Sequence, residues 1–439
     1  MVRSKRLHVL VDGEHAGTLN CDRSRMTLTY DDDYRHDPNA TPLSTSLPLG
    51  LQIHSGEPVI AYVDGLLPDS DVVRRRWAAK FHTRDSPFEL IAHVGEDCAG
   101  AVQFIREERL NQLNPGGVEW LSDQEIGAWI RQLRIDPAGW LQDVELGQFS
   151  LAGAQSKFAL RYENGRWGRP YGAIPTTHIV KPASSKFANH EINEHLALTL
   201  ARAIGLTAAG SEIIEFDGER VVVVERFDRL RLDGVIRRVH QEDMCQAAAV
   251  RPERKYENNG GPSASIVVSL IRERSSSADE DTAAFIDAFV FNWLIANTDA
   301  HAKNYGLLLA GSQCRLAPLY DLASALPYVA RVPTRREPDE LDGGRLGLAM
   351  SVAGIYRLSE IRKRDWESLF TQFGLDPLAQ LSRALSLTDA IVASMDDVVA
   401  PVVDAFGGPM PERFAASILN RIGLCRAVLT DRPTTGYRP

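Results

Sequence analysis

The sequence predicts a mixed α+β protein of two lobes, with a strand-rich N-terminal part and a mainly helical C-terminal part. Short runs of β-branched or alternating apolar residues, separated by turn residues, dominate the chain up to residue 225. The apolar spacing is helical over most of residues 365–431. Between these regions, Val221–Val224 predicts a central buried strand. The polar segment Glu225-Arg226-Phe227-Asp228 leaves that strand at once, as a hinge between lobes does.

Length and composition set the broad class. The 439 residues suffice for two or three compact units, and 44% hydrophobic with 24% charged residues is ordinary for a globular protein. No apolar run is long enough to span a bilayer, and the N-terminus turns polar too early for a signal peptide, so we expect a cytoplasmic protein without a membrane partner. The five scattered cysteines predict reduced thiols. A net charge of −9 disfavours direct nucleic-acid binding, although a local basic patch remains compatible with it.

The first 110 residues predict a scaffold. Leu7–Val11 and Gly17–Leu19 flank an Asp12-Gly13 turn, which indicates a hairpin. Strands are expected at 26–30 and 101–105, short irregular pieces at 43–49 and 66–70, and a basic helix over 72–81. The triplet Arg74–Arg76 is interpreted as a solvated face of that helix. Nothing in this region indicates catalysis.

A small-residue segment follows a boundary at Asn114–Gly117. Ser122 and Glu125 predict a capping box at the start of a helix that runs to about residue 133. Residues 146–160 then predict a strand, a turn rich in small residues and a second strand. Small residues let backbone N–H groups approach a phosphate closely. The segment lacks both the GxGxxG and the Walker pattern, so a plain β-hairpin is the competing interpretation.

A lysine and two glutamates come next. Thr177–Lys181 is a short apolar strand whose lysine resembles the one that holds nucleotide phosphates in kinases, although an edge-strand lysine is the commoner explanation. The helix expected over 191–204 carries Glu191 and Glu194 in its first turns. Either carboxylate could pair with Lys181, and either also suits the helix dipole.

The strongest chemical signal is the polar loop after a buried helix. Phe285–Ala296 is apolar on nearly every face, and Asp299 and Asn304 follow at the spacing of the catalytic base and the metal-binding Asn of kinases. Asp321 comes after a β pair expected at 305–309 and 314–317. Helical periodicity is also expected at 241–250 and 265–271, and breaks in the last helices at Gly374, Pro401 and 407–409. Alone, the loop could be a polar turn with a capping Asn.

The order of these segments is the order of a protein kinase, which gives each residue a role. Asp299 would accept the proton of the acceptor hydroxyl, and Asn304 and Asp321 would hold Mg²⁺. Lys181 would neutralise the α- and β-phosphates of ATP, and backbone amides of residues 151–157 would cover them. His301 lacks a His or Cys companion, so nucleotide or loop-organising contacts are favoured over a metal role.

The chain also resembles the HipA serine/threonine kinases, the toxins of bacterial toxin–antitoxin pairs. The motifs that carry the resemblance are LPDSDVVRRR, GEDCAGAVQFI, SLAGAQSK, THIVKPA, VVERFDR, HQEDMCQ, NTDAHAKN and PLYDLASA. It extends from about residue 7 to beyond residue 348. It implies a two-lobed kinase-like fold related to phosphoinositide kinases. It also implies three parts: a partner-binding α/β subdomain (1–110), a nucleotide-binding region (111–245) and a helical lobe with the catalytic loop (246–439).

The resemblance further implies site residues and partners. Ser150 would be the autophosphorylation site, whose modification ejects the phosphate loop and silences the kinase. This fits the physics, since a dianion at the mouth of the site repels nucleotide phosphates. The partners would be a small dimeric helix-turn-helix antitoxin, through which DNA is contacted, and a protein substrate, of which glutamyl-tRNA synthetase is the best known in the family. ATP would contact residues of five segments: Ala152, Gly153, Ala154, Gln155, Ser156 and Lys157; Lys181; Glu225, Arg226 and Phe227; His301, Lys303 and Asn304; and Tyr320 and Asp321.

Two other functions fit the same residues. Asp299-Ala300-His301 also resembles the loop of phosphoinositide and aminoglycoside kinases, so the acceptor could be a small molecule or a lipid. A pseudokinase that acts as an antitoxin-bound corepressor is the alternative from a different class. The presence of every expected catalytic residue argues against it.

Overall fold

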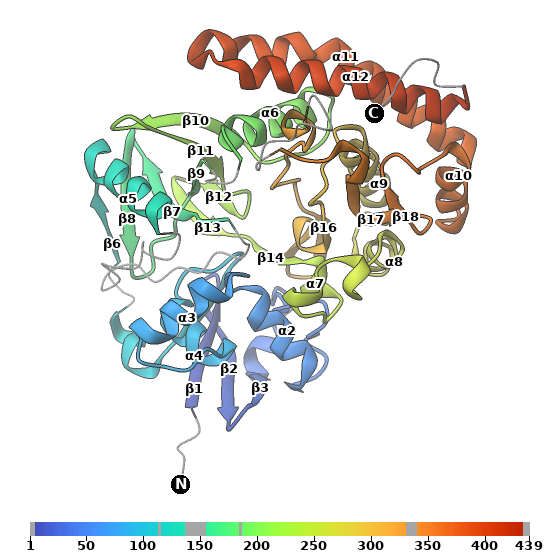
Figure 1. Cartoon of the computed structure of the whole chain (residues 1–439). Coiled ribbons are helices and arrows are strands. Elements are labelled where there is room, and N and C mark those ends of the chain that lie inside the picture. The colour runs from blue at the N-terminus through green and yellow to red at the C-terminus, as the bar shows by residue number, and fades with distance from the viewer. Residues whose placement is uncertain (1–4, 113–115, 137–154, 184–186, 331–339, 433–439) are drawn as a thin grey trace.

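The computed structural model describes residues 5–112, 116–136, 155–183, 187–330 and 340–432. Three hydrophobic cores organise them: one within residues 7–104, one within 126–223 and the largest within 192–429. In Figure 1 the N-terminal part lies at the bottom, a second sheet at the left and the long C-terminal helices at the top. All five cysteines are free thiols, as predicted.

The N-terminal part is a five-stranded antiparallel sheet in the order β4-β3-β2-β1-β5, covered by helices. The predicted hairpin is confirmed: Asp12 and Gly13 have φ angles of 47° and 84°, the left-handed values that a two-residue hairpin turn of type I′ requires. Its elements are β1 Lys5–Val11, β2 Glu14–Asp22, β3 Arg25–Tyr30, β4 Ile53–Ser55, β5 Val102–Ile105, α1 Asp32–His36, α2 Glu57–Gly65, α3 Asp71–Lys80 and α4 Pro87–Val94.

Two features of this part differ from the sequence interpretation. Helices α2 and α4 were not predicted; each is under ten residues long and is stabilised mainly by burial of its apolar side chains. Arg74 does not lie on a solvated face, because its guanidinium bonds to the buried carboxylate of Asp64 at 2.7 Å and to Asp85 at 3.3 Å. Periodicity alone did not show that acidic partners lie behind this helix.

The second sheet has six antiparallel strands in the order β10-β11-β9-β7-β8-β6. The four-valine strand is buried on both faces: Val221 and Val223 belong to the core beneath α5, whereas Val222 and Val224 belong to the core around α6. This explains why no polar residue alternates in it. The elements are β6 Gly117–Trp120, α5 Asp123–Ile135, β7 Phe158–Glu163, β8 Arg166–Tyr171, β9 His178–Pro182, α6 His190–Ala203, β10 Ser211–Phe216 and β11 Glu219–Glu225.

The helical lobe is built around α9, which is buried on nearly every face, as predicted. Its helices are α7 Met244–Ala247, α8 Ala264–Arg274, α9 Ala278–Leu294, α10 Lys363–Gln372, α11 Pro377–Phe406 and α12 Pro409–Thr430. Its strands are the hairpin β12 Arg229–Leu232 and β13 Val235–Arg238, the sheet β14 His240–Asp243, β15 Gly306–Ala310 and β16 Gln313–Leu316, and the pair β17 Gly347–Val352 and β18 Ile355–Arg357.

Two predictions for this lobe were wrong. The segment 241–250 is not one helix, because residues up to Asp243 pair with β15 and only α7 is helical. Pro401 does not break the last helices but lies inside α11. Pro401 and Asp397, whose carbonyl loses its helical partner, are both exposed, so water can satisfy that carbonyl.

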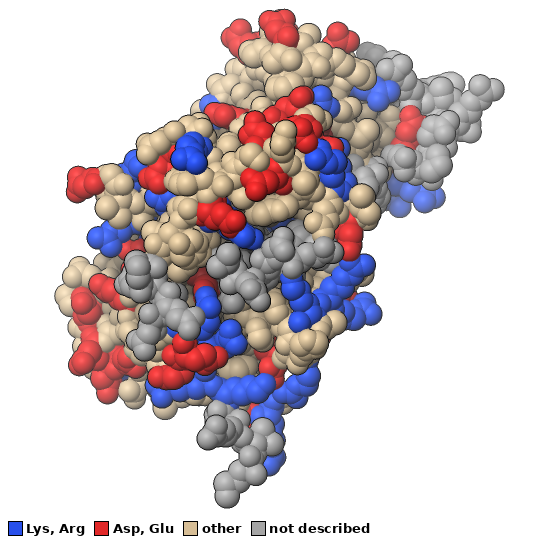
Figure 2. All heavy atoms as spheres, turned by 90° about the vertical axis from the view of Figure 1, so that its left-hand side faces the viewer, with Lys and Arg blue, Asp and Glu red and all other residues tan. Residues whose placement is uncertain are grey.

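The surface carries charges of both signs. On the face in Figure 2, blue and red side chains are interspersed, with blue gathered toward the lower end of the molecule, where Figure 1 places the N-terminal part. The net charge of −9 is therefore not spread as a uniform acidic field. Among the described residues, no helix is both long enough and apolar enough to cross a bilayer.

Candidate active site

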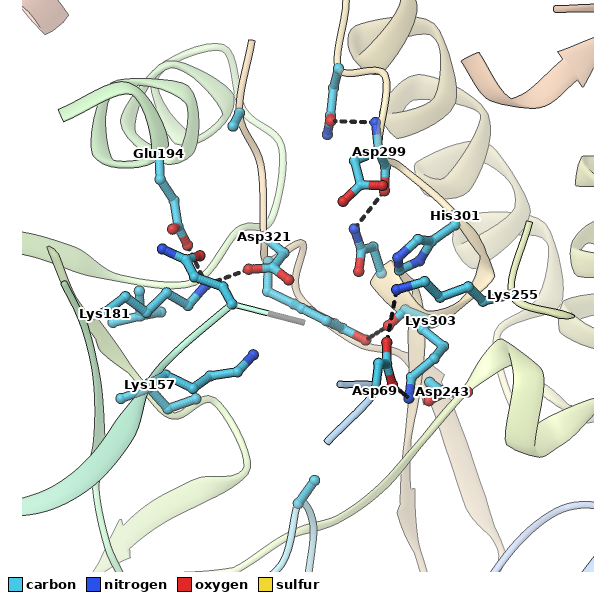
Figure 3. A pocket seen from close by; sticks show the side chains of 18 of the residues that line it. Asp69, Lys157, Lys181, Glu194, Asp243, Lys255, Asp299, His301, Lys303 and Asp321 are labelled. Atoms are coloured by element: carbon cyan, nitrogen blue, oxygen red, sulfur yellow. Dashed lines mark hydrogen bonds and ion pairs between the residues drawn. The ribbon is translucent and has the colours of Figure 1, made fainter. Parts of the chain in front are cut away.

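A cavity of about 660 Å³ lies where the three parts of the chain meet, and Figure 3 shows the charged side chains that point into it. It receives residues from the segment after α2, from β9, α6 and the end of β11, and from the loops on either side of β15 and β16. Sequence-distant acids and bases thus face one space. Those with charged or titratable side chains include Asp69, Lys157, Lys181, Glu194, Asp243, Lys255, Asp299, His301, Lys303 and Asp321.

Lys181 is the link between the sheet and the helical lobe. Its register opposite Val222 on β11 places it on the α6 face of the sheet. There its ammonium donates to Glu194 of α6 at 2.5 Å and to Asp321. Of the two glutamates that the sequence suggests as partners of Lys181, Glu194 is the one that binds it. Glu191 instead accepts from Arg220 at 2.8 Å.

Electrostatics keep this cluster ionised. Burial opposes the charge on Lys181, but Asp321 and Glu194 outweigh it and raise the pKa of the ammonium. Burial likewise opposes ionisation of Asp321, yet Lys181 and Lys157 hold the pKa of its carboxyl far below the ordinary value. Asp321 also has a left-handed backbone, with φ of 56°. This conformation is uncommon for non-glycine residues, although Asp and Asn adopt it more readily than most.

The loop after α9 presents Asp299 and Asn304 to the same cavity. The side-chain amide of Asn304 donates to the carbonyl of Asp299 at 2.8 Å, which leaves its Oδ1 for another partner. The carboxylate of Asp299 accepts from the hydroxyl of Tyr256 at 2.5 Å. The Tyr320 hydroxyl donates to the carbonyl of Lys303 at 2.6 Å and so ties the Asp321 segment to this loop.

His301 lies within this loop as a neutral, buried ring. Burial, and then the charge on Lys255, lowers the pKa of its imidazole to about 4. The ring packs edge-on against Tyr256, with centroids 5.0 Å apart, and its buried Nδ1 has no hydrogen-bond partner among the described residues. An orphaned ring nitrogen at the cavity wall suits a contact with a bound ligand.

Only part of the small-residue segment can be placed. Ser150, Ala152, Gly153 and Ala154 lie outside the described residues. Gln155 and Lys157 line the cavity, and Gln155 donates to the carbonyl of Pro182 at 3.4 Å. Ser156 is partly buried beside them but is not part of the cavity wall. Burial lowers the pKa of Lys157, which forms no salt bridge within the described part of the chain and points into the cavity in Figure 3.

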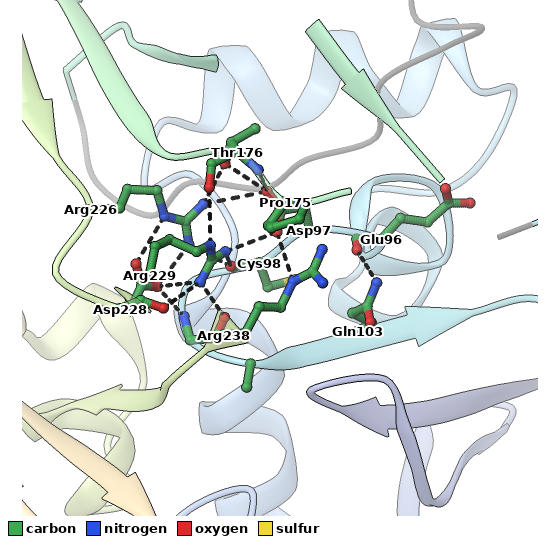
Figure 4. Close-up of polar contacts among 12 residues, drawn as sticks. Glu96, Asp97, Cys98, Gln103, Pro175, Thr176, Arg226, Asp228, Arg229 and Arg238 are labelled. Atoms are coloured by element: carbon green, nitrogen blue, oxygen red, sulfur yellow. Dashed lines mark hydrogen bonds and ion pairs between the residues drawn. The ribbon is translucent and has the colours of Figure 1, made fainter. Parts of the chain in front are cut away.

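The hinge segment Glu225, Arg226 and Phe227 also borders the cavity. The Phe227 ring lies beside Tyr320, with centroids 5.5 Å apart. The side chain of Arg226, however, belongs to the buried network in Figure 4, where it donates to Asp228 at 2.7 Å and to the Cys98 carbonyl at 2.8 Å. Any contribution of Arg226 to a ligand therefore comes from its backbone.

The Arg226 network fastens the hinge to the N-terminal part. Its members are Asp97, Thr176, Arg226, Asp228, Arg229 and Arg238. Burial opposes ionisation of Asp97, but the three arginines outweigh it and lower the pKa of the carboxyl. Burial, and then Arg226, lowers the pKa of Arg229 to about 10, because three guanidiniums here face two carboxylates.

Sequence reasoning missed three acidic residues of the cavity, Asp69, Glu242 and Asp243. Asp69 belongs to the N-terminal part, in which no catalytic feature was expected, yet its carboxylate accepts from Lys303 and from Lys255, each at 2.7 Å. The only signal for Asp69 in the sequence is its place in the LPDSDVVRRR motif, because its partners Lys255 and Lys303 are 186 and 234 positions away. Lys303, expected at the nucleotide, directs its ammonium to Asp69.

The donor set fits a Mg²⁺–nucleotide. Asp321 and the Oδ1 of Asn304, which accepts no hydrogen bond from the described residues, are hard oxygen donors, and Lys157 and Lys181 supply positive charge beside them. No group of three or more His, Cys, Asp or Glu side chains in the described ranges is arranged to hold a metal ion. A site with few protein ligands suits Mg²⁺, which also takes phosphate oxygens and water as ligands.

Fold and site together define a two-lobed, kinase-like enzyme. Residues 149–404 match the family described as HipA-like C-terminal domain, and residues 7–105 match the HipA N-terminal domain. The chain therefore belongs to the HipA family of serine/threonine kinase toxins.

Individual relatives support the same family membership. The candidate kinase Y4mE of Sinorhizobium fredii is 32% identical, over 96% of this chain and 98% of its own. The serine/threonine-protein kinase toxin HipA of Shewanella oneidensis is 31% identical, over 71% of this chain and 73% of its own. The solved HipA of Shewanella oneidensis MR-1, in complex with HipB and operator DNA, has the same fold. Its TM-score is 0.82 at 23% identity, with 98% of this chain and 100% of that chain covered.

Proposed function

We propose that this chain uses ATP and Mg²⁺ to phosphorylate serine or threonine residues of a protein and so acts as a growth-arresting toxin. The observation that carries the proposal is the convergence of Lys181, Asp321, Asn304 and Asp299 on one cavity. Asp299 orients the acceptor hydroxyl and accepts its proton, while Asp321 and Asn304 hold Mg²⁺. When bound, Mg²⁺ neutralises the charge that develops on the transferred phosphoryl group.

The hinge supplies the remaining nucleotide contacts in this proposal. In the described part of the chain, the backbone N–H of Phe227 has no hydrogen-bond partner and is free for an adenine acceptor. The Phe227 and Tyr320 rings offer apolar surface to a base. Lys157 and Lys181 neutralise phosphates, and the orphaned Nδ1 of His301 is available to the nucleotide.

Regulation and partners follow from the family. By resemblance to the family, we infer that Ser150 is the autophosphorylation site, where an added dianion would oppose the binding of nucleotide phosphates. The partner is a small helix-turn-helix antitoxin of the HipB type, which contacts operator DNA and engages residues 1–110. The substrate is a component of translation, with glutamyl-tRNA synthetase as the first candidate and a persistent, dormant state as the outcome.

The test is labelled ATP incubated with the purified chain, a lysate of its host and a panel of small alcohols and lipids. Label on one protein band, lost with Asp321→Asn, supports a protein kinase. Label only on a small molecule would make this chain a small-molecule kinase, and no transfer with intact nucleotide binding would make it a pseudokinase. Induced expression of each variant in cells then tests growth arrest.

A further inference from the structure

Asp69 connects the N-terminal part to the catalytic loop. It lies between α2 and α3, and each of its carboxylate oxygens binds a different lysine: Oδ1 accepts from Lys303 and Oδ2 from Lys255, both at 2.7 Å. The Asp69 side chain is 11% exposed, and the side chains of Lys303 and Lys255 are 4% and 12% exposed. Burial opposes the charge on Asp69, but the lysines outweigh it and lower the pKa of its carboxyl to about 2.

Each lysine is joined to one catalytic group. Lys303 directly precedes Asn304, which carries the oxygen assigned to the metal. Lys255 directly precedes Tyr256, whose hydroxyl donates to the Asp299 carboxylate at 2.5 Å. The carbonyl of Lys255 also accepts from the N–H of Ala302, inside the catalytic loop, at 3.3 Å. One carboxylate therefore reaches both the base and the metal ligand through two short paths.

Asp69 is itself held in place by a tightly packed contact. The Gln246 amide donates to the carbonyl of Tyr62 in α2 at 2.9 Å. A Cβ added to Gly65, at the end of the same helix, would lie 2.8 Å from Cγ of Gln246. The hydroxyl of Ser44 donates to buried Glu242 at 2.5 Å. The Gln246 contacts hold α2 against α7, and the Ser44 bond holds the segment before β4 against β14. The N-terminal part that carries Asp69 is therefore packed against the lobe that carries both lysines.

We propose that Asp69 is a positioning residue of the kinase reaction, which makes the N-terminal part a working component of the active site. Asp69 touches neither nucleotide nor acceptor; it sets the position of Asp299 through Lys255 and Tyr256, and that of Asn304 through Lys303. This inference rests on the proposed kinase function and adds a residue to it. An ion pair that only joined two domains would affect stability but not the turnover of bound substrate.

The kinetic test compares Asp69→Asn, Asp69→Glu and the control Asp85→Asn in the full-length chain at saturating Mg²⁺. Asp85 is an N-terminal carboxylate that also pairs with a cation, Arg74 at 3.3 Å, but does not line the cavity. We expect Asp69→Asn to lower kcat by roughly 10²-fold with KM for ATP changed less, because a displacement of about 1 Å in a catalytic group has that effect. Asp69→Glu should restore part of kcat, and Asp85→Asn should match wild type. An unchanged kcat for folded Asp69→Asn would overturn the inference.

A second measurement separates this inference from the kinase assignment. Amide hydrogen exchange is followed in the nucleotide-free chain for peptides covering 297–305 and, as a reference, α6. Asp69→Asn should speed exchange in the loop peptide several-fold and leave the reference unchanged. If wild type transfers no phosphate, the proposed function fails, and the exchange result still decides whether Asp69 orders the loop. Equal loop exchange in wild type and Asp69→Asn would refute the inference.

Discussion

Lys181 and Asp321 are separated by 140 positions in the sequence but form an ion pair at the centre of the cavity. The pair joins the six-stranded sheet to the helical lobe, and Glu194 completes it from α6 at 2.5 Å. Because the register of β9 against β11 determines which face Lys181 occupies, a shift of one residue would bury it beneath α5 instead.

Removing the cation should affect both reaction and stability. Lys181→Met leaves two carboxylates facing each other in a buried site, so we expect phosphate transfer to fall by about 10²–10³-fold and the chain to lose about 3 kcal/mol of unfolding free energy. Initial rates and denaturant unfolding measure the two effects. Lys363→Met, which removes a partly exposed surface pair with Glu367 at 2.8 Å, is the control and should be near neutral. Wild-type transfer by Lys181→Met would contradict the assigned role.

Asp299 should matter for transfer rather than for nucleotide binding. In Asp299→Asn the backbone carbonyl that accepts from Asn304 is retained, so the metal ligand keeps its support. We expect the transfer rate to fall by about 10²–10⁴-fold, the usual contribution of a positioned base, with ATP affinity within a few-fold of wild type. Fluorescent-nucleotide titration and initial rates measure these quantities. Asp279→Asn, on the exposed first turn of α9, serves as control. A matching loss of affinity would assign Asp299 to binding.

The Arg226 network predicts a mainly structural phenotype. Arg226→Met removes hydrogen bonds to Asp228, Thr176 and the Cys98 carbonyl. We expect a loss of about 3 kcal/mol in unfolding free energy, with ATP affinity of the folded variant changed little. Chemical denaturation measures the unfolding free energy, and nucleotide titration measures the ATP affinity. Arg231→Met, on the β12–β13 hairpin that follows Arg226 and with a side chain 54% exposed, should be neutral in both. Lost ATP affinity at unchanged stability would instead favour direct contact between the Arg226 side chain and ATP.

His240 predicts a pH-dependent difference in stability. Its Nδ1 accepts from the N–H of Ala101 at 3.2 Å and its Nε2 donates to the carbonyl of Leu43 at 2.8 Å, so the buried ring is neutral. Burial lowers its pKa to about 4 from an ordinary 6.5. Between these values the unfolded chain binds a proton that the folded chain does not.

Neutral His240 stabilises the fold less as the pH falls. The stability that neutral His240 contributes is complete above pH 6.5 and is lost as the pH falls toward 4. The unfolding free energy of wild type minus that of His240→Gln should therefore decrease by about 3 kcal/mol over this range. Urea unfolding of both proteins at several pH values measures it. Neighbouring Glu242 titrates in both proteins, so its contribution cancels and the difference in unfolding free energy reports the titration of His240 alone. A difference independent of pH would show that His240 carries charge in the fold.

The sequence predicted the parts of the site that depend on local pattern. Three features can be predicted from periodicity or spacing within a few residues. They are the buried helix, the Asp299–Asn304 spacing and the lysine on a short strand. The pairing of Lys181 with Glu194 rather than Glu191 cannot be predicted in this way. Both glutamates lie in the first turns of α6, and only the packing of that helix selects one of them.

Long-range packing also explains the other misses. Asp69 lies in an irregular segment with no periodic signal, and its role appears only when α2 docks against α7. Arg74 was assigned to solvent because its acidic partners, Asp64 and Asp85, lie on other segments. The sequence predicts a helix break at Pro401, but α11 continues through this residue because Pro401 is exposed and water can satisfy the carbonyl that loses its helical partner.

The most direct test is the intact mass of the purified chain before and after incubation with ATP and Mg²⁺, alongside Asp321→Asn treated in the same way. The account predicts that wild type gains one phosphate group, located at Ser150 by peptide mapping, and that Asp321→Asn gains none. Equal phosphate incorporation by the two proteins would contradict the claim that Lys181, Asp321, Asn304 and Asp299 form the phosphate-transfer site.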